Sequence, residues 1–430
     1  MKVLLLGAGG RESALANGLA RSSSVSALAA MPSNPGIASV ADTIEGDPTK
    51  PEFVISAARS LSSDLIVVGP EAPLVAGVAD AAREAGIEVF GPQREAARIE
   101  GSKSYAKELM TKSAIPTAAS QTCTSIDSAI AAMDGFGPPY VIKADGLAAG
   151  KGVVVTTDRN EALDALEDRL VRGGFGDAGR TVVIEEFLDG EELSLIAFSD
   201  GKTVVACEPA QDYKRAYDDD RGPNTGGMGS YSPVPACPDE LSHRIVSEVL
   251  EPMVHAVSEQ GTPFVGALYA GLALTSKGPR VIEFNARFGD PETQALLPRL
   301  KSDLGEVCMA AATGSLAGMT LEWDPRSCVS VVLASAGYPG SYETGREITG
   351  LDSVEAMQDV WAFHAGTALV DGALVTAGGR VLAVSALGAA FDDARERAYR
   401  AADMIEFEGK HIRRDIAQRA VLRTETGPSA

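Results

Sequence analysis

The chain has 430 residues, of which 45% are apolar and 23% charged, as in soluble globular proteins, and this length corresponds to roughly two to four domains. Its 38 Lys and Arg residues against 59 Asp and Glu residues give a net charge of −21, which argues against broad binding to nucleic acid or to an anionic membrane. The sequence has no run of about 18 apolar residues that could span a membrane. A small anionic ligand remains compatible with this charge, because it needs only a local group of cations and backbone N–H groups.

The first apolar run and the cysteines favour a cytoplasmic protein. Val3–Leu6 is too short for the apolar core of a signal peptide and leads directly into a glycine-rich loop, so we interpret it as a strand. The five cysteines and four histidines are scattered. This pattern predicts reduced, mostly buried thiols rather than disulfides, and no metal cluster built from these residues.

Residues 1–102 alternate short apolar runs with helical stretches and predict an N-terminal α/β domain with a parallel sheet. We expect strands at residues 2–6, 25–30, 64–68 and 87–90, and helices at 12–21, 51–61 and 74–85. Ligands of such sheets bind at the carboxyl ends of the strands. Three loops lie there, at residues 7–11, 34–36 and 69–73.

The first of these loops, Gly7-Ala-Gly-Gly-Arg11, follows a strand and opens a helix. Glycines let the backbone approach an anion, and the helix N-terminus supplies free N–H groups. The loop resembles a dinucleotide-binding motif, but Glu12 occupies the place of the third glycine. Phosphate binding is therefore the favoured interpretation. A nicotinamide cofactor and a tight turn without a ligand are the alternatives.

Residues 103–325 hold the remaining charged motifs. We expect a polar helix within residues 101–120, and then a small α/β lobe at about 118–190 with strands at 139–143, 153–156 and 181–186 and a helix at 159–172. Further strands are expected at 192–198, 203–207, 266–275 and 280–284, with a helix at 238–259. Residues 326–430 predict a C-terminal α+β domain with strands at 328–334, 360–363, 373–376 and 380–386 and a helix at 391–404.

Two lysines flank a glycine-rich loop in the small lobe. The expected strand ends in Lys143, and the loop presents Gly150, Lys151 and Gly152. The spacing is not that of a Walker motif, but backbone N–H groups and two lysines can surround a polyphosphate. A hairpin with solvated lysines is the alternative. Further on, the backbone of Glu186–Leu188 could hydrogen-bond an adenine, although solvated acidic turns are common.

Two oxygen-bearing side chains lie on the strand that ends near residue 285. Glu283 and Asn285 are separated by one residue, so they share a face of the strand. Mg²⁺ prefers oxygen ligands and commonly takes one or two from protein, with phosphates completing its shell. Arg287, Asp290 and Glu292 follow on the adjoining loop. A polar row on an apolar strand is costly if buried without function, which favours a metal site over a solvated strand edge.

Residues 211–235 are expected to form a long polar loop that contains Asp212, Lys214 and a glycine-rich run at 222–230. Long loops inside compact domains are usually functional or disordered. We interpret this one as a lid over an anionic substrate, with a plain linker as the alternative.

Taken in this order, the segments resemble the phosphoribosylamine–glycine ligase (glycinamide ribonucleotide synthetase) family. The resemblance covers nearly the whole chain and is carried by residues 7–12, 69–74, 143–152, 185–192, 211–215, 223–229, 283–292 and 378–380. The run Arg287–Gln294 is similar to the family's signature. The resemblance implies an α/β protein with the ATP-grasp fold, in which an N-terminal Rossmann-like parallel-sheet domain, two ATP-clasping lobes and a C-terminal α+β domain are combined.

The resemblance also implies the reaction. ATP would drive the ligation of glycine to 5-phosphoribosylamine through a glycyl phosphate, giving glycinamide ribonucleotide, ADP and phosphate in purine synthesis. ATP would act with one or two Mg²⁺ or Mn²⁺ ions. We expect a monomer whose partners are these small molecules, with no nucleic acid or membrane partner.

The family pattern assigns residues to each ligand. The ATP set is Lys103, Lys143, Gly150, Lys151, Gly152, Glu185, Glu186, Phe187, Leu188 and Glu192. The phosphoribosylamine set is Gly9, Gly10, Arg11, Glu12, Pro70, Glu71, Ala72 and Pro73. The set around the reacting groups is Asp212, Lys214, Asn224, Thr225, Gly226, Gly227, Met228, Arg287, Asp290, Pro291 and Glu292. Glu283 and Asn285 would hold the metal, and we expect catalysis to involve Lys143, Arg287 and Asp290.

Two positions depart from the family's pattern. Ser13 stands where the family usually has His, and Ala417 stands where it usually has Gly. Three other functions remain as alternatives: a related carboxylate–amine ligase with another acceptor, a nucleotide-dependent regulatory protein and a nicotinamide dehydrogenase. The loops at 69–74 and 290–292 argue against the first. Intact Lys143, Lys151, Glu283 and Asn285 argue against the second, and the missing third glycine against the third.

Overall fold

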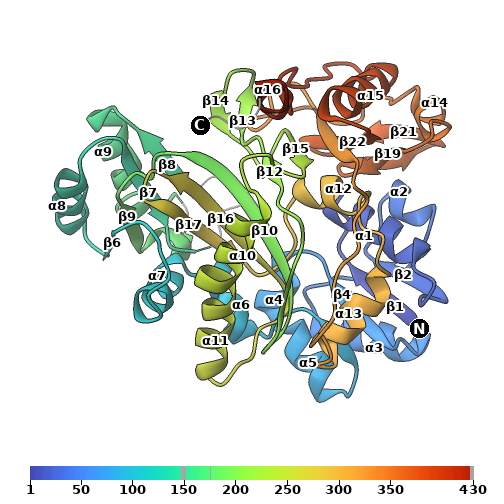
Figure 1. Cartoon of the computed structure of the whole chain (residues 1–430), viewed down its shortest axis with the longest axis horizontal. Helices are drawn as coiled ribbons and strands as arrows, with labels where there is room; N and C mark the ends of the chain where they lie inside the picture. The colour runs from blue at the N-terminus through green and yellow to red at the C-terminus, as the bar shows by residue number, and fades with distance from the viewer. Residues whose placement is uncertain (147–151, 175, 427–430) are drawn as a thin grey trace.

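The computed structural model describes residues 1–146, 152–174 and 176–426, and its larger sheets meet around the middle of the molecule (Figure 1). The first sheet is parallel, with the strand order β3–β2–β1–β4–β5. Its strands are β1 (Lys2–Leu6), β2 (Ala27–Met31), β3 (Asp42–Thr43), β4 (Leu65–Val68) and β5 (Glu88–Phe90). The order reverses between β1 and β4, which is where parallel sheets bind their ligands.

Helices pack around this first sheet because its apolar strands are buried on both faces. They are α1 (Gly10–Arg21), α2 (Pro35–Ala38), α3 (Pro51–Leu61), α4 (Glu71–Ala76), α5 (Val78–Glu84) and α6 (Arg94–Gly101). The next helix, α7 (Lys103–Lys112), packs against α6. The single helix expected at 74–85 is wrong. Gly77 has a φ of 85°, ends α4 and precedes α5, so the chain makes two short helices there.

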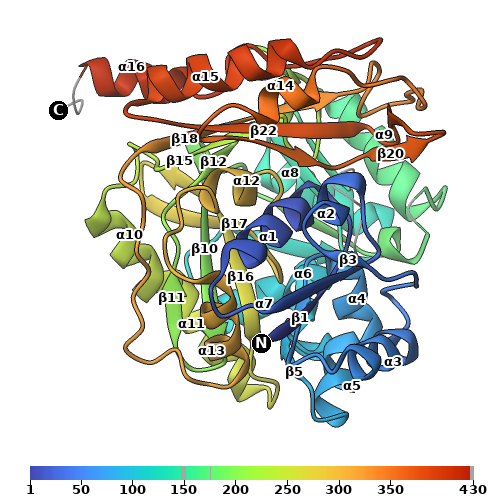
Figure 2. The same ribbon diagram turned by 90° about the vertical axis from the view of Figure 1, so that its right-hand side faces the viewer.

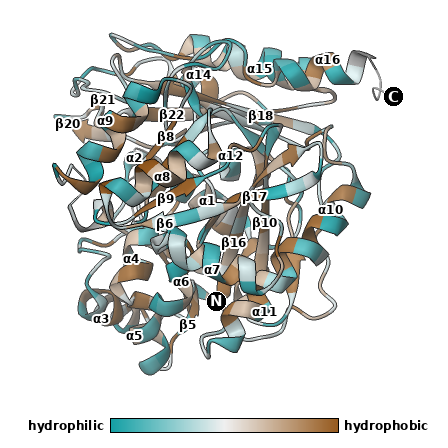
Figure 3. Cartoon of the chain, turned by 90° about the vertical axis from the view of Figure 1, so that its left-hand side faces the viewer, coloured by the Kyte–Doolittle hydropathy of each residue, from teal (hydrophilic) through white to brown (hydrophobic). Residues whose placement is uncertain are grey.

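The small lobe has an antiparallel sheet with the order β6–β9–β7–β8 and its own buried apolar cluster. Its elements are β6 (Ser120–Cys123), α8 (Ile126–Phe136), β7 (Tyr140–Ala144), β8 (Val153–Thr156), α9 (Arg159–Leu170), a 3₁₀ turn (Gly176–Gly179) and β9 (Val182–Glu185). Figure 3 shows hydrophilic and hydrophobic residues alternating along α9 and α11, as expected for helices that bury one face.

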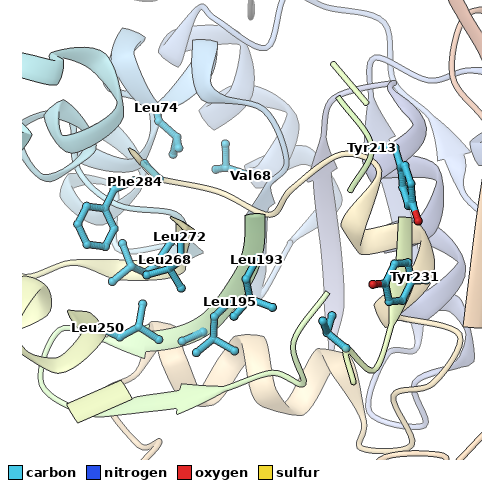
Figure 4. Packing of buried hydrophobic residues seen from close by; sticks show 14 of the residues in the cluster. Val68, Leu74, Leu193, Leu195, Tyr213, Tyr231, Leu250, Leu268, Leu272 and Phe284 are labelled. Carbon is cyan, nitrogen blue, oxygen red and sulfur yellow. The ribbon is translucent and has the colours of Figure 1, made fainter. Parts of the chain in front are cut away.

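The central antiparallel sheet has the order β11–β10–β16–β17. Its strands are β10 (Glu191–Asp200), β11 (Val204–Ala206), β16 (Val265–Thr275) and β17 (Gly278–Asn285). The helical stretch expected at 238–259 comprises α10 (Asp239–Ile245), a π turn (Val246–Leu250) and α11 (Glu251–Glu259). Figure 4 shows the buried side chains that join these layers, which include Leu193, Leu195, Leu250, Leu268, Leu272 and Phe284.

The expectation of a long loop at 211–235 is wrong, because this segment contains four short strands. They are β12 (Gln211–Asp212), β13 (Arg215–Tyr217), β14 (Arg221–Asn224) and β15 (Gly229–Ser232). β13 and β14 form a hairpin, whereas β12 and β15 join a fourth sheet with the order β12–β15–β18–β22–β19. Polar, glycine-rich strands of this length carry little local signal, and β18, the partner of β15, lies far along the sequence.

The C-terminal strands complete that fourth sheet, and α15 covers it (Figure 2). These elements are β18 (Ser327–Ala334), α14 (Leu351–Glu355), β19 (Val360–His364), the hairpin β20 (Thr367–Val370) with β21 (Ala373–Thr376), β22 (Arg380–Gly388), α15 (Phe391–Met404) and α16 (Gln418–Thr426). Between the central sheet and β18 lie α12 (Glu292–Leu296) and α13 (Leu304–Ala312).

The five cysteines, Cys123, Cys207, Cys237, Cys308 and Cys328, are buried free thiols, which confirms the expectation from their spacing. None of the described helices is long and apolar enough to cross a membrane.

Three phenylalanines connect the first sheet, the central sheet and the segment that follows β17. Phe90 ends β5, Phe198 lies on β10 and Phe288 follows Asn285. The ring centroids are 5.4 Å apart for Phe198 and Phe288, 5.7 Å for Phe90 and Phe198, and 6.0 Å for Phe90 and Phe288. All three side chains are buried, so this cluster fixes the two sheets relative to each other.

We expect Phe198→Ala to lower the free energy of unfolding by about 3–5 kcal/mol, because it leaves a cavity between two sheets. Phe53→Ala on α3 removes a side chain that is 49% exposed and should change it by only about 0.5 kcal/mol. Urea unfolding followed by circular dichroism measures both. Equal destabilisation by the two substitutions would contradict the assigned role of Phe198.

Candidate functional site

A cavity of about 520 Å³ lies where the sheets meet, and residues from distant parts of the sequence line it. Arg11 and Glu71 follow strands of the first sheet, Lys103 begins α7, and Arg380 begins β22. From the predicted set the lining also includes Lys143, Gly152, Glu185, Glu186, Phe187, Leu188, Glu192, Asp212, Lys214, Asn224, Thr225, Gly226, Glu283, Asn285, Arg287, Asp290 and Glu292. Gly150 and Lys151 lie outside the described residues.

Two lysines share one buried carboxylate at one side of the cavity. Lys143 on β7 and Lys107 on α7 each lie 3.1 Å from the same oxygen of Glu185, at the end of β9. Lys143 also donates to the carbonyl of Ile282 at 3.0 Å. Burial lowers the pKa of Lys107 to about 8, although Glu185 opposes the shift. The other oxygen of Glu185 is buried and has no hydrogen-bond donor among the described residues, so it can accept a hydrogen bond from a ligand.

The segment after β9 presents its backbone to the cavity. The Glu186 carboxylate is turned to other partners: it accepts from the Ala119 N–H at 2.9 Å and pairs with Arg280 at 3.2 Å. Phe187 is 45% exposed, which is high for an aromatic side chain that lines a cavity. The Glu186 N–H donates to the Ala119 carbonyl at 2.9 Å, which leaves the Glu186 carbonyl, the backbone of Phe187 and Leu188 and their apolar side chains to face a planar ligand.

Glu283 and Asn285 both line the cavity from β17, as their spacing predicts. Among the described residues, no hydrogen bond or ion pair joins either side chain to another group. Burial lowers the pKa of the nearby Lys103, and Glu283 opposes that shift. No group of three or more His, Cys, Asp or Glu residues is arranged for a metal in the described part of the chain. A metal at Glu283 and Asn285 therefore needs ligands from elsewhere, which phosphate oxygens and water supply for Mg²⁺.

Arg287 connects the end of β17 to the first sheet's helices. It lies 3.4 Å from Glu71 on α4 and 2.8 Å from Glu100 on α6. Burial disfavours the charge of Arg287, but the two carboxylates outweigh it and raise its pKa. Burial raises the pKa of Glu100, while Arg287 and the Ala286 N–H, at 2.8 Å, oppose the shift.

Asp290 joins the first and the fourth sheets. Its carboxylate pairs with Arg380 at 3.1 Å and accepts from the Arg11 N–H at 3.3 Å and from Gln294 at 2.8 Å. Burial acts to raise the pKa of Asp290, but Arg380 and Arg11 bring it below its ordinary value. Asp290 is therefore held as a carboxylate between two arginines.

Lys214, which also lines the cavity, lies between two carboxylates. Its ammonium is 2.7 Å from Glu192 on β10 and 2.8 Å from Asp212 on β12. Burial acts to lower the pKa of Lys214, but the two acids raise it well above its ordinary value. The attraction of Lys214 lowers the pKa of Glu192. Burial raises the pKa of Asp212 to about 7 against that attraction.

Residues of the first glycine-rich loop and of the helix that follows it contact one another. The Glu12 carboxylate accepts from the Gly9 N–H at 2.7 Å and pairs with Arg11, whose Nη1 donates to the Phe288 carbonyl at 3.1 Å. Arg11 therefore reaches the cavity from α1. Nine predicted residues do not line the cavity but adjoin residues that do or lie in the same loop: Gly9, Gly10, Glu12, Pro70, Ala72, Pro73, Gly227, Met228 and Pro291.

Several cavity residues were not among the predicted site residues: Glu100, Lys107, Tyr269, Tyr338 and Arg380. Glu100 and Lys107 had a signal that could have found them. Each is a charged residue on the buried, otherwise apolar face of its helix, beside Ile99 and Ala106 respectively. Tyr269 and Tyr338 follow no local pattern that separates them from ordinary core or surface aromatics.

Models of three regions of the phosphoribosylglycinamide synthetase family match the chain. The N domain matches residues 1–100, the ATP-grasp (A) domain residues 101–293 and the C domain residues 328–419. A phosphoribosylamine–glycine ligase of Streptomyces coelicolor is 53% identical over 423 residues, which cover 98% of this chain and 99% of the relative. That of Agrobacterium fabrum is 49% identical with the same coverage.

A solved structure agrees with these matches. The crystal structure of a phosphoribosylamine–glycine ligase from Thermotoga maritima has a TM-score of 0.84 and 34% sequence identity, and the match covers 96% of this chain and all of that one. The predicted fold class is thereby confirmed. The chain has the ATP-grasp fold and belongs to the phosphoribosylamine–glycine ligase (phosphoribosylglycinamide synthetase) family.

Proposed function

We propose that the cavity catalyses the ATP-dependent ligation of glycine to 5-phosphoribosylamine, giving glycinamide ribonucleotide, ADP and phosphate in purine synthesis. The observation that carries this proposal is that all three family regions line the same cavity: Arg11 from the first, Lys143 and Glu283 from the second and Arg380 from the third. A carboxylate is a poor electrophile, so ATP first converts glycine to an acyl phosphate. The ribosylamine nitrogen then attacks, and phosphate leaves.

ATP fits the side of the cavity between the small lobe and β17. The unpartnered oxygen of Glu185 would accept a hydrogen bond from the adenine amino group, and the backbone of Glu186–Leu188 would meet the ring edge. Lys143, Lys103 and Lys151 would neutralise phosphate charge together with the Gly150–Gly152 loop. By the family pattern, Glu192 would bind the ribose. In phosphoryl transfer the protein acts mainly by such positioning and charge stabilisation.

One or two Mg²⁺ or Mn²⁺ ions fit Glu283 and Asn285, whose oxygens have no protein partner in the described chain. Glu283 and Asn285 would hold such an ion, which would offset the negative charge of the phosphates. Glu283 contributes the negative charge of the site, and Asn285 a neutral carbonyl oxygen. Lys103 lies near enough to Glu283 to feel its charge, so metal and lysine would act on the same phosphates.

Phosphoribosylamine fits the side of the cavity where Asp290 contacts Arg11 and Arg380. The two arginines supply the positive charge that a phosphate ester needs. Glu71, which pairs with Arg287, lines the same cavity. Asn224, Thr225 and Gly226 would cover the reacting groups, with Arg287, Asp290 and Lys143 closest to the chemistry. We also propose three domains, at residues 1–102, 103–325 and 326–430, in a monomer.

The purified chain should form ADP only slowly with ATP and Mg²⁺ alone, and at full rate when glycine and freshly prepared 5-phosphoribosylamine are both present. A coupled ADP assay gives the rates, and mass spectrometry identifies glycinamide ribonucleotide. Strong turnover with another amino acid, and none with glycine, would contradict the proposal.

Lys143→Ala should lower kcat by roughly 100-fold or more, because it removes a buried positive charge directed at the transferred phosphate. Lys112→Ala is the matched control: this lysine lies on the exposed side of α7 and pairs with Glu108. Single-turnover kinetics with saturating ATP should separate the two variants. If Lys143→Ala turned over at the rate of Lys112→Ala, Lys143 would not belong to the phosphate site.

Glu283→Gln preserves size and removes the charge proposed to bind metal. We expect a large loss of kcat and a higher Mg²⁺ concentration for half-maximal rate, with an unchanged melting temperature. Asn285→Asp should be milder, because it keeps an oxygen ligand and adds charge. A lower melting temperature with an unaltered Mg²⁺ dependence would show instead that Glu283 is structural.

A further inference from the structure

Nearly every carboxylate that lines the cavity has a cation partner. Arg287 pairs with Glu71 and Glu100, and Lys107 and Lys143 pair with Glu185. The remaining pairs are Arg280 with Glu186, Lys214 with Glu192 and Asp212, and Arg380 with Asp290. Within the described chain, only Glu283 and Glu292 line the cavity without an ion pair. Glu283 belongs to the proposed metal site, so Glu292 is the remaining carboxylate of the described lining that has no ion pair.

Glu292 is 3% exposed and begins α12. One of its oxygens accepts from the Ser194 hydroxyl at 2.9 Å, and that hydroxyl lies 2.9 Å from the Tyr269 hydroxyl. Its other oxygen has no partner in the described chain. A Cβ at Gly289 would lie 2.4 Å from this second oxygen, so the glycine leaves room for it. An ionised carboxylate buried in this way is costly unless a cation reaches it.

The surroundings of Glu292 add further negative charge. Glu192 and Ser194 are two residues apart on β10 and therefore share a face of the strand. Ser194 holds Glu292, while Glu192 pairs with Lys214 and, through it, contacts Asp212. Lys214 is thus taken up by Glu192 and Asp212. The charge of Glu292 also acts on Arg287 and Arg380, but both arginines are paired with other carboxylates. A ligand with a single positive charge would balance the charge of Glu292 better than a neutral or anionic one.

We infer that Glu292, with Asp212 nearby, binds the ammonium group of glycine, an inference that rests on the proposed function. Glycine's own amine is a nucleophile that could compete with the ribosylamine for the acyl phosphate. An ammonium group paired with a carboxylate has no free electron pair, so this contact both selects an amino acid and keeps its nitrogen unreactive. The carboxylate end of the same molecule is then left to accept the phosphoryl group.

The test compares glycine with glycolate, which replaces the ammonium by a hydroxyl group, in the full-length protein with saturating ATP, Mg²⁺ and 5-phosphoribosylamine. Glu292→Gln keeps the size of the side chain and its contact with Ser194 but removes the charge. We expect kcat/KM for glycine to fall by about 10- to 150-fold, the range for a hydrogen bond to a charged group. The value for glycolate should stay nearly the same, so the preference for glycine should collapse.

Asp212→Asn should move the preference in the same direction by a smaller factor, and it decides the question if Glu292→Gln does not fold. Glu240→Gln, at an exposed position in the first turn of α10, is the matched control and should behave as wild type. An equal loss with glycine and glycolate in both site variants would overturn the inference and leave the proposed function intact. No glycine-dependent turnover by the wild-type protein would overturn both.

Discussion

The ion pairs of Arg287 with the half-buried Glu71 and the buried Glu100 are the interaction on which the arrangement of the cavity depends. Arg287 follows β17, whereas the two acids lie on α4 and α6, so these pairs hold the first sheet against the strand that presents Glu283 and Asn285. A charge as buried as that of Glu100 is stable only when paired, since removal from water costs several kcal/mol for each ion. The same condition applies elsewhere around the cavity. Glu185 pairs with Lys143 and holds its side chain in place, and Asp290 does the same for Arg380.

The sequence predicts the elements whose pattern is local. Four parallel strands of the first sheet and the helix at 391–404 lie close to the expected bounds, because apolar runs and helical periodicity are visible within one short window. The fifth strand, β3, was not expected, because it has only two residues, both polar. β12 to β15 were missed because they are short and polar: β13 and β14 pair with each other, and β12 and β15 join a sheet through the pairing of β15 with β18, which no local pattern shows. The predicted residues Lys143, Glu283, Arg287 and Asp290 do line one cavity, whereas Tyr269 and Arg380 reach it only through the tertiary fold.

The two departures from the family's pattern have different structural settings. The Ser13 hydroxyl on α1 accepts from the His364 N–H at 3.1 Å, so position 13 connects the first sheet's helix to β19 and does not line the cavity. Ala417 is buried and has a φ of 61°, a conformation that costs an L-residue about 1–2 kcal/mol relative to the right-handed region. The neighbouring pairs of Arg413 with Asp415 and Asp220 maintain this backbone.

The pairing of β15 with β18 also sets an order of events during synthesis of the chain. β12 and β15 leave the ribosome well before β18 and β22, so one edge of β15 has no partner while translation continues. An open strand edge is a template for pairing with other chains. Arg380 is also still missing, so during the same interval Asp290 lacks its ion pair with Arg380. The nascent protein is therefore most exposed to aggregation just before β18 emerges, and it completes its cavity only with the last strands.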